Sequence, residues 1–251
     1  MNELVSIITP TFNSKEQITE TYNSILSQDY TNWEWLVTDD CSTDSTVELL
    51  LDISARDKRV KVFVNEINGG AAVSRNKSIG NSSGSYLAFL DSDDLWEENK
   101  ISSQLEFMKK DAIDFSFTPY EIVDKDGASS GKFVDTHLSC PVNYNDMLRK
   151  KATLGCSTVM LRRAAFKDLT MPLLRTGQDY ALWLKLLKDG VEAHIMPTVL
   201  SKYRILPGSI SRNKLKKARR QWEIYRVVEG LDYFIAIECF SYYAVRAIFR
   251  K

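Results

Sequence analysis

The sequence has no surplus of charge and few cysteine or histidine residues. Its 251 residues contain 33 Lys and Arg against 33 Asp and Glu, so the basic excess of a general nucleic-acid-binding protein is missing and no nucleic-acid partner is expected. The two histidines and four scattered cysteines include no Cys-x-x-Cys pair and indicate neither a zinc site nor a disulfide framework. This cysteine usage fits a reducing, cytosolic setting.

Long hydrophobic runs are missing as well. The chain enters a predicted strand directly after residues 1–4, without the basic and apolar regions of a secretory signal, which favours a cytoplasmic location. The nearest approach to a membrane span, residues 231–249, contains Asp232, Glu238 and Arg246, whose burial in lipid would be costly. No spanning helix is therefore predicted, whereas attachment of this segment to a membrane surface stays open.

Short apolar segments alternate with helical patterns in the first third of the chain. The periodicity predicts strands at residues 5–8, 33–37, 60–64 and 86–90, with a helix after each of the first three. Ser14 and Gln17 fit a capping box at the start of the first helix. The alternation implies parallel strands joined by right-handed crossovers, which is an α/β fold with a Rossmann-like, mostly parallel sheet.

The pattern loosens after residue 94, where a mixed arrangement is expected. It predicts helices at residues 99–110, 146–150 and 180–187, strands at 115–118 and 157–161, and a hairpin around 124–127. The tail from residue 215 is helical in pattern. The simplest division is a catalytic domain at residues 1–212 followed by a basic and aromatic helical extension at residues 213–251.

The acidic run Asp91-Ser92-Asp93-Asp94 follows the apolar strand predicted at residues 86–90. Ligand sites in open α/β sheets gather at the carboxyl ends of such strands. Adjacent carboxylates repel one another unless a cation satisfies them, and a divalent cation with oxygen ligands suits the position. Helix capping needs one acid, so it explains a run of three poorly. The run therefore predicts a site for a metal-bridged anion.

Other polar clusters also follow predicted strands or begin helices. They are Pro10-Thr11-Phe12-Asn13, Asp39-Asp40 and Gly177-Gln178-Asp179. Each one alone has a local explanation, because Asp and Asn begin helices and turns; for Asp39 and Asp40 that explanation is an even alternative, and Asp179 fits the N-cap of the helix at residue 180. The argument for function is that the clusters share one edge of the sheet.

With these motifs in this order, residues 4–212 resemble the family 2 inverting glycosyltransferases, which have the GT-A fold and use a nucleotide-diphosphate-sugar donor. The resemblance is carried by residues 5–13, 24–28, 35–44, 68–76 and 91–93. The last of these segments is similar to the DxD signature of the family. The resemblance implies a GT-A fold with a C-terminal helical extension, a UDP-sugar donor, and Mn²⁺ or Mg²⁺ as cofactor.

The resemblance also implies roles for single residues. Donor and nucleotide contacts are expected from Pro10, Thr11, Asn13, Asp40, Arg75, Asp91, Ser92 and Arg204. Among them Asp40 is expected at the uracil ring and Arg204 at the diphosphate. Asp93 is the expected metal ligand, and Asp94 either coordinates directly or orients a metal-bound water. Asp179 is the expected catalytic base, which takes the proton from the acceptor hydroxyl.

Two segments depart from the family pattern. The family commonly has an acid before the base, and this chain has Gln178. The late loop at residues 203–211 often contains a histidine in the family, whereas this chain has Ile205 and Leu206, so no histidine metal ligand is expected. A flexible loop that happens to contain Arg204 is the alternative explanation there.

A basic run lies ahead of aromatic residues in the tail. It consists of Arg212, Lys214, Lys216, Lys217, Arg219 and Arg220. A solvated helix face is one interpretation, and an interfacial helix on anionic lipid is the other. The aromatic residues at 233–243 favour the membrane, because many proteins of the resembling family act on lipid-linked acceptors.

Together these features predict an inverting, metal-dependent glycosyltransferase that moves a hexose from a UDP-sugar to a glycan hydroxyl, on a polyprenyl-diphosphate-linked acceptor, at the inner face of the cell membrane. Bacterial polysaccharide synthesis of the O-antigen, capsule or teichuronic type is the expected setting. A nucleotidyltransferase is one rival, although the loop at residues 10–13 lacks its glycine-rich and basic character. A non-catalytic nucleotide-sugar-binding module is the other, and the presence of Asp179 argues against it.

Overall fold

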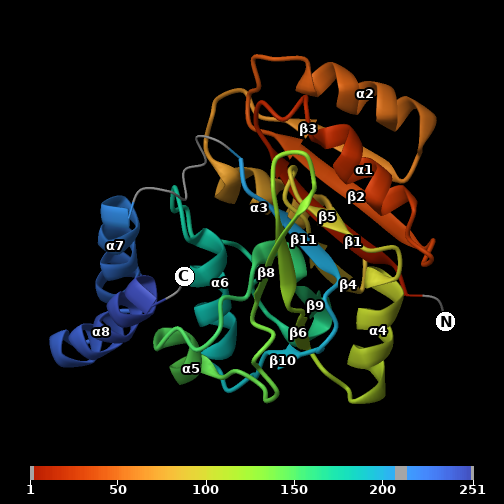
Figure 1. Cartoon of the computed structure of the whole chain (residues 1–251). Coiled ribbons are helices and arrows are strands. Elements are labelled where there is room, and N and C mark those ends of the chain that lie inside the picture. Colours follow the sequence, from red (N-terminus) through yellow and green to blue (C-terminus); the bar gives the residue numbers. More distant parts are fainter. Residues whose placement is uncertain (1–2, 207–213, 250–251) are drawn as a thin grey trace.

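The computed structural model describes residues 3–206 and 214–249, and a seven-stranded sheet organises most of them (Figure 1). The strand order is β10-β6-β9-β4-β1-β2-β3. The bounds are β1 Val5–Thr11, β2 Trp33–Asp39, β3 Val60–Val64, β4 Tyr86–Phe89, β6 Phe115–Phe117, β9 Met160–Arg162 and β10 His194–Ile195. β1 is parallel to β2 and β4, and β2 is parallel to β3, so the predicted parallel half is confirmed.

The second half of the sheet is mixed, as expected, because β9 is antiparallel to both of its neighbours, β4 and β6. The strand predicted at residues 157–161 is wrong in its first part, where the 3₁₀ turn Cys156–Thr158 precedes β9. A four-stranded sheet of order β5-β11-β7-β8 lies beside the large one. Its bounds are β5 Leu95–Trp96, β11 Ser201–Arg204, β7 Tyr120–Val123 and β8 Ser129–Val134. β7 and β8 form the predicted hairpin.

Helices cover both faces of the large sheet (Figure 1). Their bounds are α1 Ile18–Leu26, α2 Thr46–Arg56, α3 Ala71–Asn81, α4 Lys100–Lys110, α5 Tyr144–Leu148, α6 Gln178–Leu187, α7 Lys214–Glu223 and α8 Tyr233–Phe249. Successive strand residues point to opposite faces, so Ile7 of β1 joins a buried cluster with α1, α2 and α4, and Ile8 joins another with α3, α5 and α6. Burial on both sides explains why the strands are nearly continuous apolar runs.

Helix α1 begins at Ile18 rather than at Ser14, so the predicted capping box is wrong. Gln17 occupies the N-cap position and makes no side-chain capping bond. The Ser14 hydroxyl lies 2.9 Å from the Ser92 hydroxyl instead, and this long-range hydrogen bond replaces the local one. The start of α1 is thereby tied to the acidic loop that follows β4.

The C-terminal helices α7 and α8 pack beside α5 and α6 at one end of the molecule (Figure 1). A π-helical segment, Ile224–Val228, connects them. Ile224, Tyr225, Ala236 and Cys239 belong to the buried cluster that contains α6, and the Tyr225 hydroxyl donates to the Leu148 carbonyl at 2.6 Å. The extension therefore shares its core with the sheet. In the described part of the chain, no helix combines the length and apolar character that a membrane span requires.

Candidate active site

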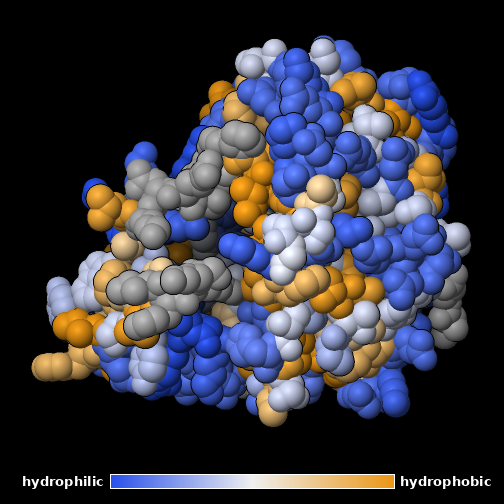
Figure 2. Space-filling view, in the orientation of Figure 1, coloured by the Kyte–Doolittle hydropathy of each residue, from blue (hydrophilic) through white to orange (hydrophobic). Residues whose placement is uncertain are grey.

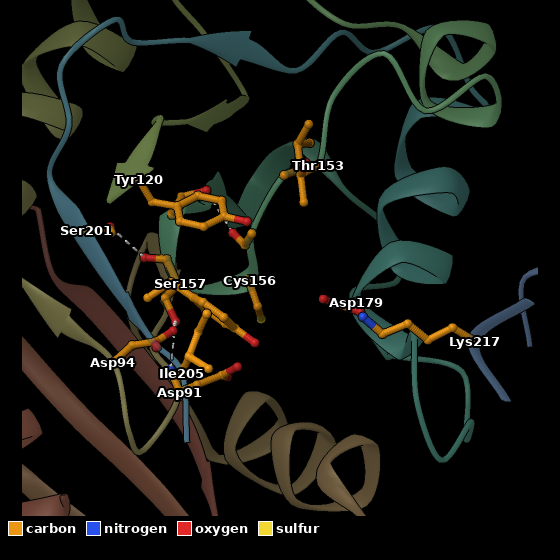
Figure 3. A pocket seen from close by; sticks show the side chains of 14 residues that line it. Asp91, Asp94, Tyr120, Thr153, Cys156, Ser157, Asp179, Ser201, Ile205 and Lys217 are labelled. Atoms are coloured by element: carbon orange, nitrogen blue, oxygen red, sulfur yellow. Dashed lines mark hydrogen bonds between the residues drawn. The ribbon is translucent and has the colours of Figure 1, made fainter. Parts of the chain in front are cut away.

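A cavity of about 580 Å³ opens beyond the carboxyl end of β4 (Figure 3). It is lined by Asp91, Asp94, Tyr120, Thr153, Leu154, Gly155, Cys156, Ser157, Thr158, Asp179, Ser201, Tyr203, Ile205 and Lys217. Asp91 and Asp94 lie on one side of it, and Asp179 lies across from them with the Lys217 side chain beside it (Figure 3). The structure thus brings Asp91 and Asp94 of the acidic run to one cavity with the predicted base, whereas Ser92 and Asp93 do not line it.

Asp94 holds the acidic loop in place. Ser157 Oγ donates to its Oδ2 at 2.5 Å, and the Arg204 backbone N–H donates to its Oδ1 at 3.0 Å. Ser157 Oγ also accepts from the Asp91 backbone N–H at 3.0 Å, so one serine joins both ends of the run. Burial, followed by the charges of Asp93 and Asp91, raises the pKa of the Asp94 carboxyl well above its usual value. Both Asp94 oxygens are engaged, which favours an indirect role at any metal.

Asp91 forms an ion pair with Arg75, whose side chain is buried. Burial works to lower the pKa of Arg75, and the charges of Asp91, Cys156 and Asp179 outweigh it and raise the pKa. Arg75 Nε and Nη1 are buried and have no hydrogen-bond partner within the described residues. The buried guanidinium therefore acts electrostatically on Asp91 and Asp179, although Arg75 itself does not line the cavity.

Asp93 is the acid of the run whose carboxylate accepts a hydrogen bond from its own backbone N–H. Burial and the charge of Asp91 raise its pKa to about 6, against the lowering effect of that bond and of the charges of Arg204 and Arg75. Hard carboxylate oxygens of this kind are what Mn²⁺ and Mg²⁺ prefer. No group of three or more acidic, His or Cys side chains among the described residues could hold a metal ion. Asp93 and Asp91 therefore fit a cation only if the donor's oxygens complete its coordination.

The loops after β1 and β2 interlock at the predicted nucleotide side. Asn13, in the left-handed region at φ 51°, accepts from the Thr43 backbone N–H at 2.9 Å, and its own N–H donates to Ser42 Oγ at 2.8 Å. Pro10 and Thr11 are buried at the end of β1, and Thr11 Oγ1 has no partner among the residues described. The predicted donor contacts of Pro10, Thr11 and Asn13 stay predictions.

The Asp40 carboxylate supports the turn that precedes α3. It accepts from the backbone N–H groups of Gly69 and Gly70 at 2.9 and 2.7 Å and from Asn65 Nδ2 at 3.0 Å. Gly70 has a φ of 90°, which only glycine adopts readily. Asp40 therefore orients the helix that carries Arg75. Its predicted contact with uracil stays a prediction.

Ser92 and Arg204 bind the acidic loop to its surroundings. Ser92 Oγ pairs with Ser14, and Arg204 donates from Nε to the Asp93 carbonyl at 2.9 Å and from Nη2 to Glu20 Oε2 at 2.5 Å. Arg204 Nη1 donates to the Lys125 carbonyl at 2.7 Å. These bonds favour a structural role for Arg204, and its predicted phosphate contact stays a prediction. The rest of that loop, residues 207–212, lies outside the described residues.

Asp179 lies inside the first turn of α6, so its predicted position as N-cap is wrong. The N-cap is Gly177, whose φ of 71° is in the left-handed region. A Cβ at Gly177 would lie 3.1 Å from Ile224 Cδ1, so the segment after α7 packs directly on this turn. Gln178 is buried beside the base, while Asp179 is half-buried and lines the cavity.

Sequence reasoning missed several residues that line the cavity. Ser157 began the strand predicted at residues 157–161, Cys156 preceded it, and Lys217 fell in a run interpreted as solvated or membrane-facing. Tyr120 begins β7 and Tyr203 lies in the neighbouring strand β11, and their rings lie 5.7 Å apart at the cavity wall. These residues come together only in the tertiary structure. The position of Tyr203 at the start of the late loop was the one sequence signal that could have placed it at the site.

The glycosyl transferase family 2 model matches residues 6–170 of the chain. The chain belongs to glycosyltransferase family 2. This family 2 protein is 43% identical over 248 residues to TuaG of Bacillus subtilis, named for teichuronic acid biosynthesis, covering 99% of this chain and 97% of TuaG. It is 41% identical to WfgD of Escherichia coli, covering 88% of this chain and 85% of WfgD.

Solved structures confirm the fold of this family 2 member. S. aureus TarS 1-349 in complex with UDP-GlcNAc matches with a TM-score of 0.77 and 23% identity, covering 98% of this chain and 73% of that one. Mannosyltransferase PcManGT from Pyrobaculum calidifontis, solved with GDP-Man and Mn²⁺, has a TM-score of 0.66 at 16% identity and covers 98% of this chain and 75% of that one. The predicted GT-A fold and glycosyltransferase class are confirmed, and the rival nucleotidyltransferase assignment is set aside.

Proposed function

We propose that this glycosyltransferase transfers a hexose from a UDP-sugar, with inversion and with a divalent metal, to a hydroxyl of a glycan linked to a polyprenyl diphosphate. The observation that carries the proposal is that Asp91 and Asp179 line opposite sides of one cavity. Such a site separates a donor side at the carboxyl end of β4 from an acceptor side at the start of α6. Bacterial surface-polysaccharide synthesis at the inner face of the membrane is the proposed setting.

The proposed reaction is a single displacement at C1 of the donor sugar. The acceptor hydroxyl attacks C1, the bond from C1 to the diphosphate breaks, and UDP leaves with the electron pair. The Asp179 carboxylate takes the hydroxyl proton. When bound at Asp93 and Asp91, Mn²⁺ or Mg²⁺ would supply positive charge to the departing diphosphate. Arg75 holds Asp91 on the donor side and adds its own positive charge to the field there.

The names of two relatives support the donor, the acceptor and the stereochemistry. WfgD and WfaP of Escherichia coli, at 41% and 39% identity, are named as UDP-Glc:alpha-D-GlcNAc-diphosphoundecaprenol beta-1,3-glucosyltransferases. UDP-glucose carries its sugar in the α configuration, so a β product requires inversion. We extend this substrate class to the present chain, with UDP-glucose as the first donor to test.

The decisive variant is Asp179→Asn, which removes the base and keeps the side-chain shape. Transfer from UDP-glucose to an α-GlcNAc-diphospholipid should fall at least about 100-fold, while donor affinity by calorimetry stays within about twofold. Asp189→Asn, an exposed acid beyond the other end of α6, is the matched control and should retain activity. EDTA should abolish transfer by the wild type, and Mn²⁺ should restore it. Near-normal turnover of Asp179→Asn would overturn the assignment.

We further propose that α8 places the enzyme on an anionic membrane. Phe234, Ile237 and Val245 lie on one face of α8, and all three are exposed. Figure 2 shows apolar atoms gathered at the lower left, over this helix. The basic residues of α7 lie nearby, which suits anionic lipid.

Vesicles of phosphatidylglycerol and phosphatidylcholine test the membrane contact by co-sedimentation. The triple change of Phe234, Ile237 and Val245 to Ser should reduce the bound fraction at least about fivefold. Leu51→Ser, which removes an exposed apolar side chain from α2, should leave it unchanged. Equal binding by the triple variant and the wild type would remove α8 from the membrane contact.

A further inference from the structure

We infer that Lys217 binds the diphosphate group of the lipid-linked acceptor, an inference that rests on the proposed function. Lys217 belongs to α7, outside the residues 6–170 that the family model matches. It nevertheless lines the same cavity as Asp179, and Figure 3 shows its amine directed toward that carboxylate. The C-terminal extension therefore supplies part of the acceptor side.

The position of Lys217 is set by packing of the helix that carries it. Gln221 and Ile224, four and seven residues further on, are buried, so this face of the helical segment meets the core. A Cβ on Gly177 would lie 3.1 Å from Ile224 Cδ1 and 3.8 Å from Arg220 Cγ, which places the segment against the turn before Asp179. An exposed lysine on such a fixed backbone can reach a ligand beside the base.

The charges around the cavity indicate an anion on this side. Three acidic residues line the cavity, namely Asp91, Asp94 and Asp179. Lys217 is the one basic residue among the described residues that line it. Arg75 is paired with Asp91 on the donor side, so the donor has its own cationic partner. An ammonium group binds phosphate as a point charge, without demanding the planar geometry that arginine needs.

The chemistry of a glycosyl diphosphate acceptor fits this layout. Its reacting hydroxyl must reach Asp179, and its diphosphate lies across one sugar ring from that hydroxyl. Lys217 of α7 places a positive charge on this side of Asp179. α7 and α8 lie together at one end of the molecule (Figure 1), so a lipid that extends from the diphosphate past α7 would reach α8. One face of the extension thus carries a positive charge for the diphosphate, and another carries exposed apolar side chains for the lipid.

The test compares two acceptors in neutral detergent micelles without anionic lipid. One is α-GlcNAc-diphosphofarnesol, and the other is GlcNAc joined to the same alcohol as a neutral glycoside. Lys217→Met should raise the KM for the diphosphate acceptor at least about 10-fold more than the KM for the neutral acceptor, with unchanged donor KM. Lys217→Arg should retain most of the affinity. Lys216→Met, which removes an equal charge from the same helix outside the cavity lining, is the matched control.

The outcomes separate this inference from the proposed function. If the wild type transfers to neither acceptor, the proposed function fails and the inference falls with it. If the wild type is active and Lys217→Met behaves like Lys216→Met, only the inference is overturned. A rise in donor KM, or an equal loss of kcat on both acceptors, would place Lys217 with the donor or the base and also overturn it.

Discussion

Lys100 shows how far a single residue can depart from its usual place. A lysine at the first position of a helix is ordinarily solvated, yet Lys100 of α4 is fully buried. Its ammonium lies 3.9 Å from the centre of the Trp96 ring, and it has no hydrogen-bond partner within the described residues. Burial lowers the pKa of Lys100 from 10.5 to about 7.

A lowered lysine pKa makes stability depend on pH in a known direction. Between pH 7 and 10.5 the unfolded chain holds a proton on Lys100 that the folded chain releases, so this group's penalty shrinks as the pH rises and is largest below pH 7. Lys100→Met should therefore be more stable than the wild type by about 2–4 kcal/mol at pH 6.5, with the gap closing toward pH 10. Urea unfolding across this range measures it. Lys109→Met, exposed on the same helix, should show no such pH-dependent gap.

Site residues at the ends of strands could be predicted from the sequence, whereas residues that reach the site through contacts between distant segments could not. Asp91 could be found because it follows β4, a parallel strand whose carboxyl end lies at the site, whereas Asp179 lies in the first turn of α6 and was predicted only from the family resemblance. Ser157 could not, because its value lies in joining Asp91 to Asp94 from another segment. Lys217 carried only the pattern of a basic helix, and its place in the cavity depends on the core of the extension.

At the scale of elements, prediction succeeded where one hydrophobic period governs a whole segment. β1, β2 and β4 are buried at every residue, so their apolar runs stand out in the sequence. Prediction failed where tertiary hydrogen bonds override local patterns, as at Ser14, or where elements are very short. β5 and β10 have two residues each and exist only as partners of β11 and β6.

Two glycines near the sheet should respond oppositely to alanine. A Cβ at Gly84, just before β4, would lie 2.6 Å from the Leu4 carbonyl oxygen and 2.7 Å from the Ser6 backbone nitrogen, so β1 and β4 would have to separate. We expect Gly84→Ala to lower the free energy of unfolding by about 2–3 kcal/mol. Gly80 lies in α3, and a Cβ added there would meet nothing within 4 Å. Gly80→Ala should therefore raise the free energy of unfolding by about 0.5–1 kcal/mol.

Urea denaturation of the two glycine variants beside the wild type provides the measurement. A change in midpoint with an unchanged slope would show that folded-state stability alone has moved. Equal midpoints for Gly84→Ala and the wild type would contradict the prediction, because they would mean that β1 and β4 make room for the new methyl group without loss of stability.

At the scale of the whole molecule, the C-terminal extension behaves as part of one folding unit. Ile224, Tyr225, Ala236 and Cys239 are buried with residues of α5 and α6. Deleting residues 214–251 would expose the facing core and should remove on the order of 5 kcal/mol, against a typical domain stability of about 5–15 kcal/mol. The domain boundary at residue 212 stays a prediction. The deletion tests whether the two segments on either side of this boundary fold independently.

Thermal unfolding and the soluble yield measure the effect of that deletion. Phe234→Ser changes α8 at an exposed position and should keep the wild-type Tm within about 2 °C. A truncated chain with the same Tm as the full chain would show that the extension folds independently. Membrane and acceptor tests therefore use surface substitutions in the full chain.

The serine that joins the acidic loop has a consequence for how the donor is received. Ser157 accepts from the Asp91 backbone and donates to Asp94, while Arg204 and Ser14 hold the same loop from two other sides. The loop is thus ordered by folding, before any ligand arrives. Donor capture should then lose little conformational entropy at this loop, and its rate should be set by diffusion and charge rather than by a slow rearrangement.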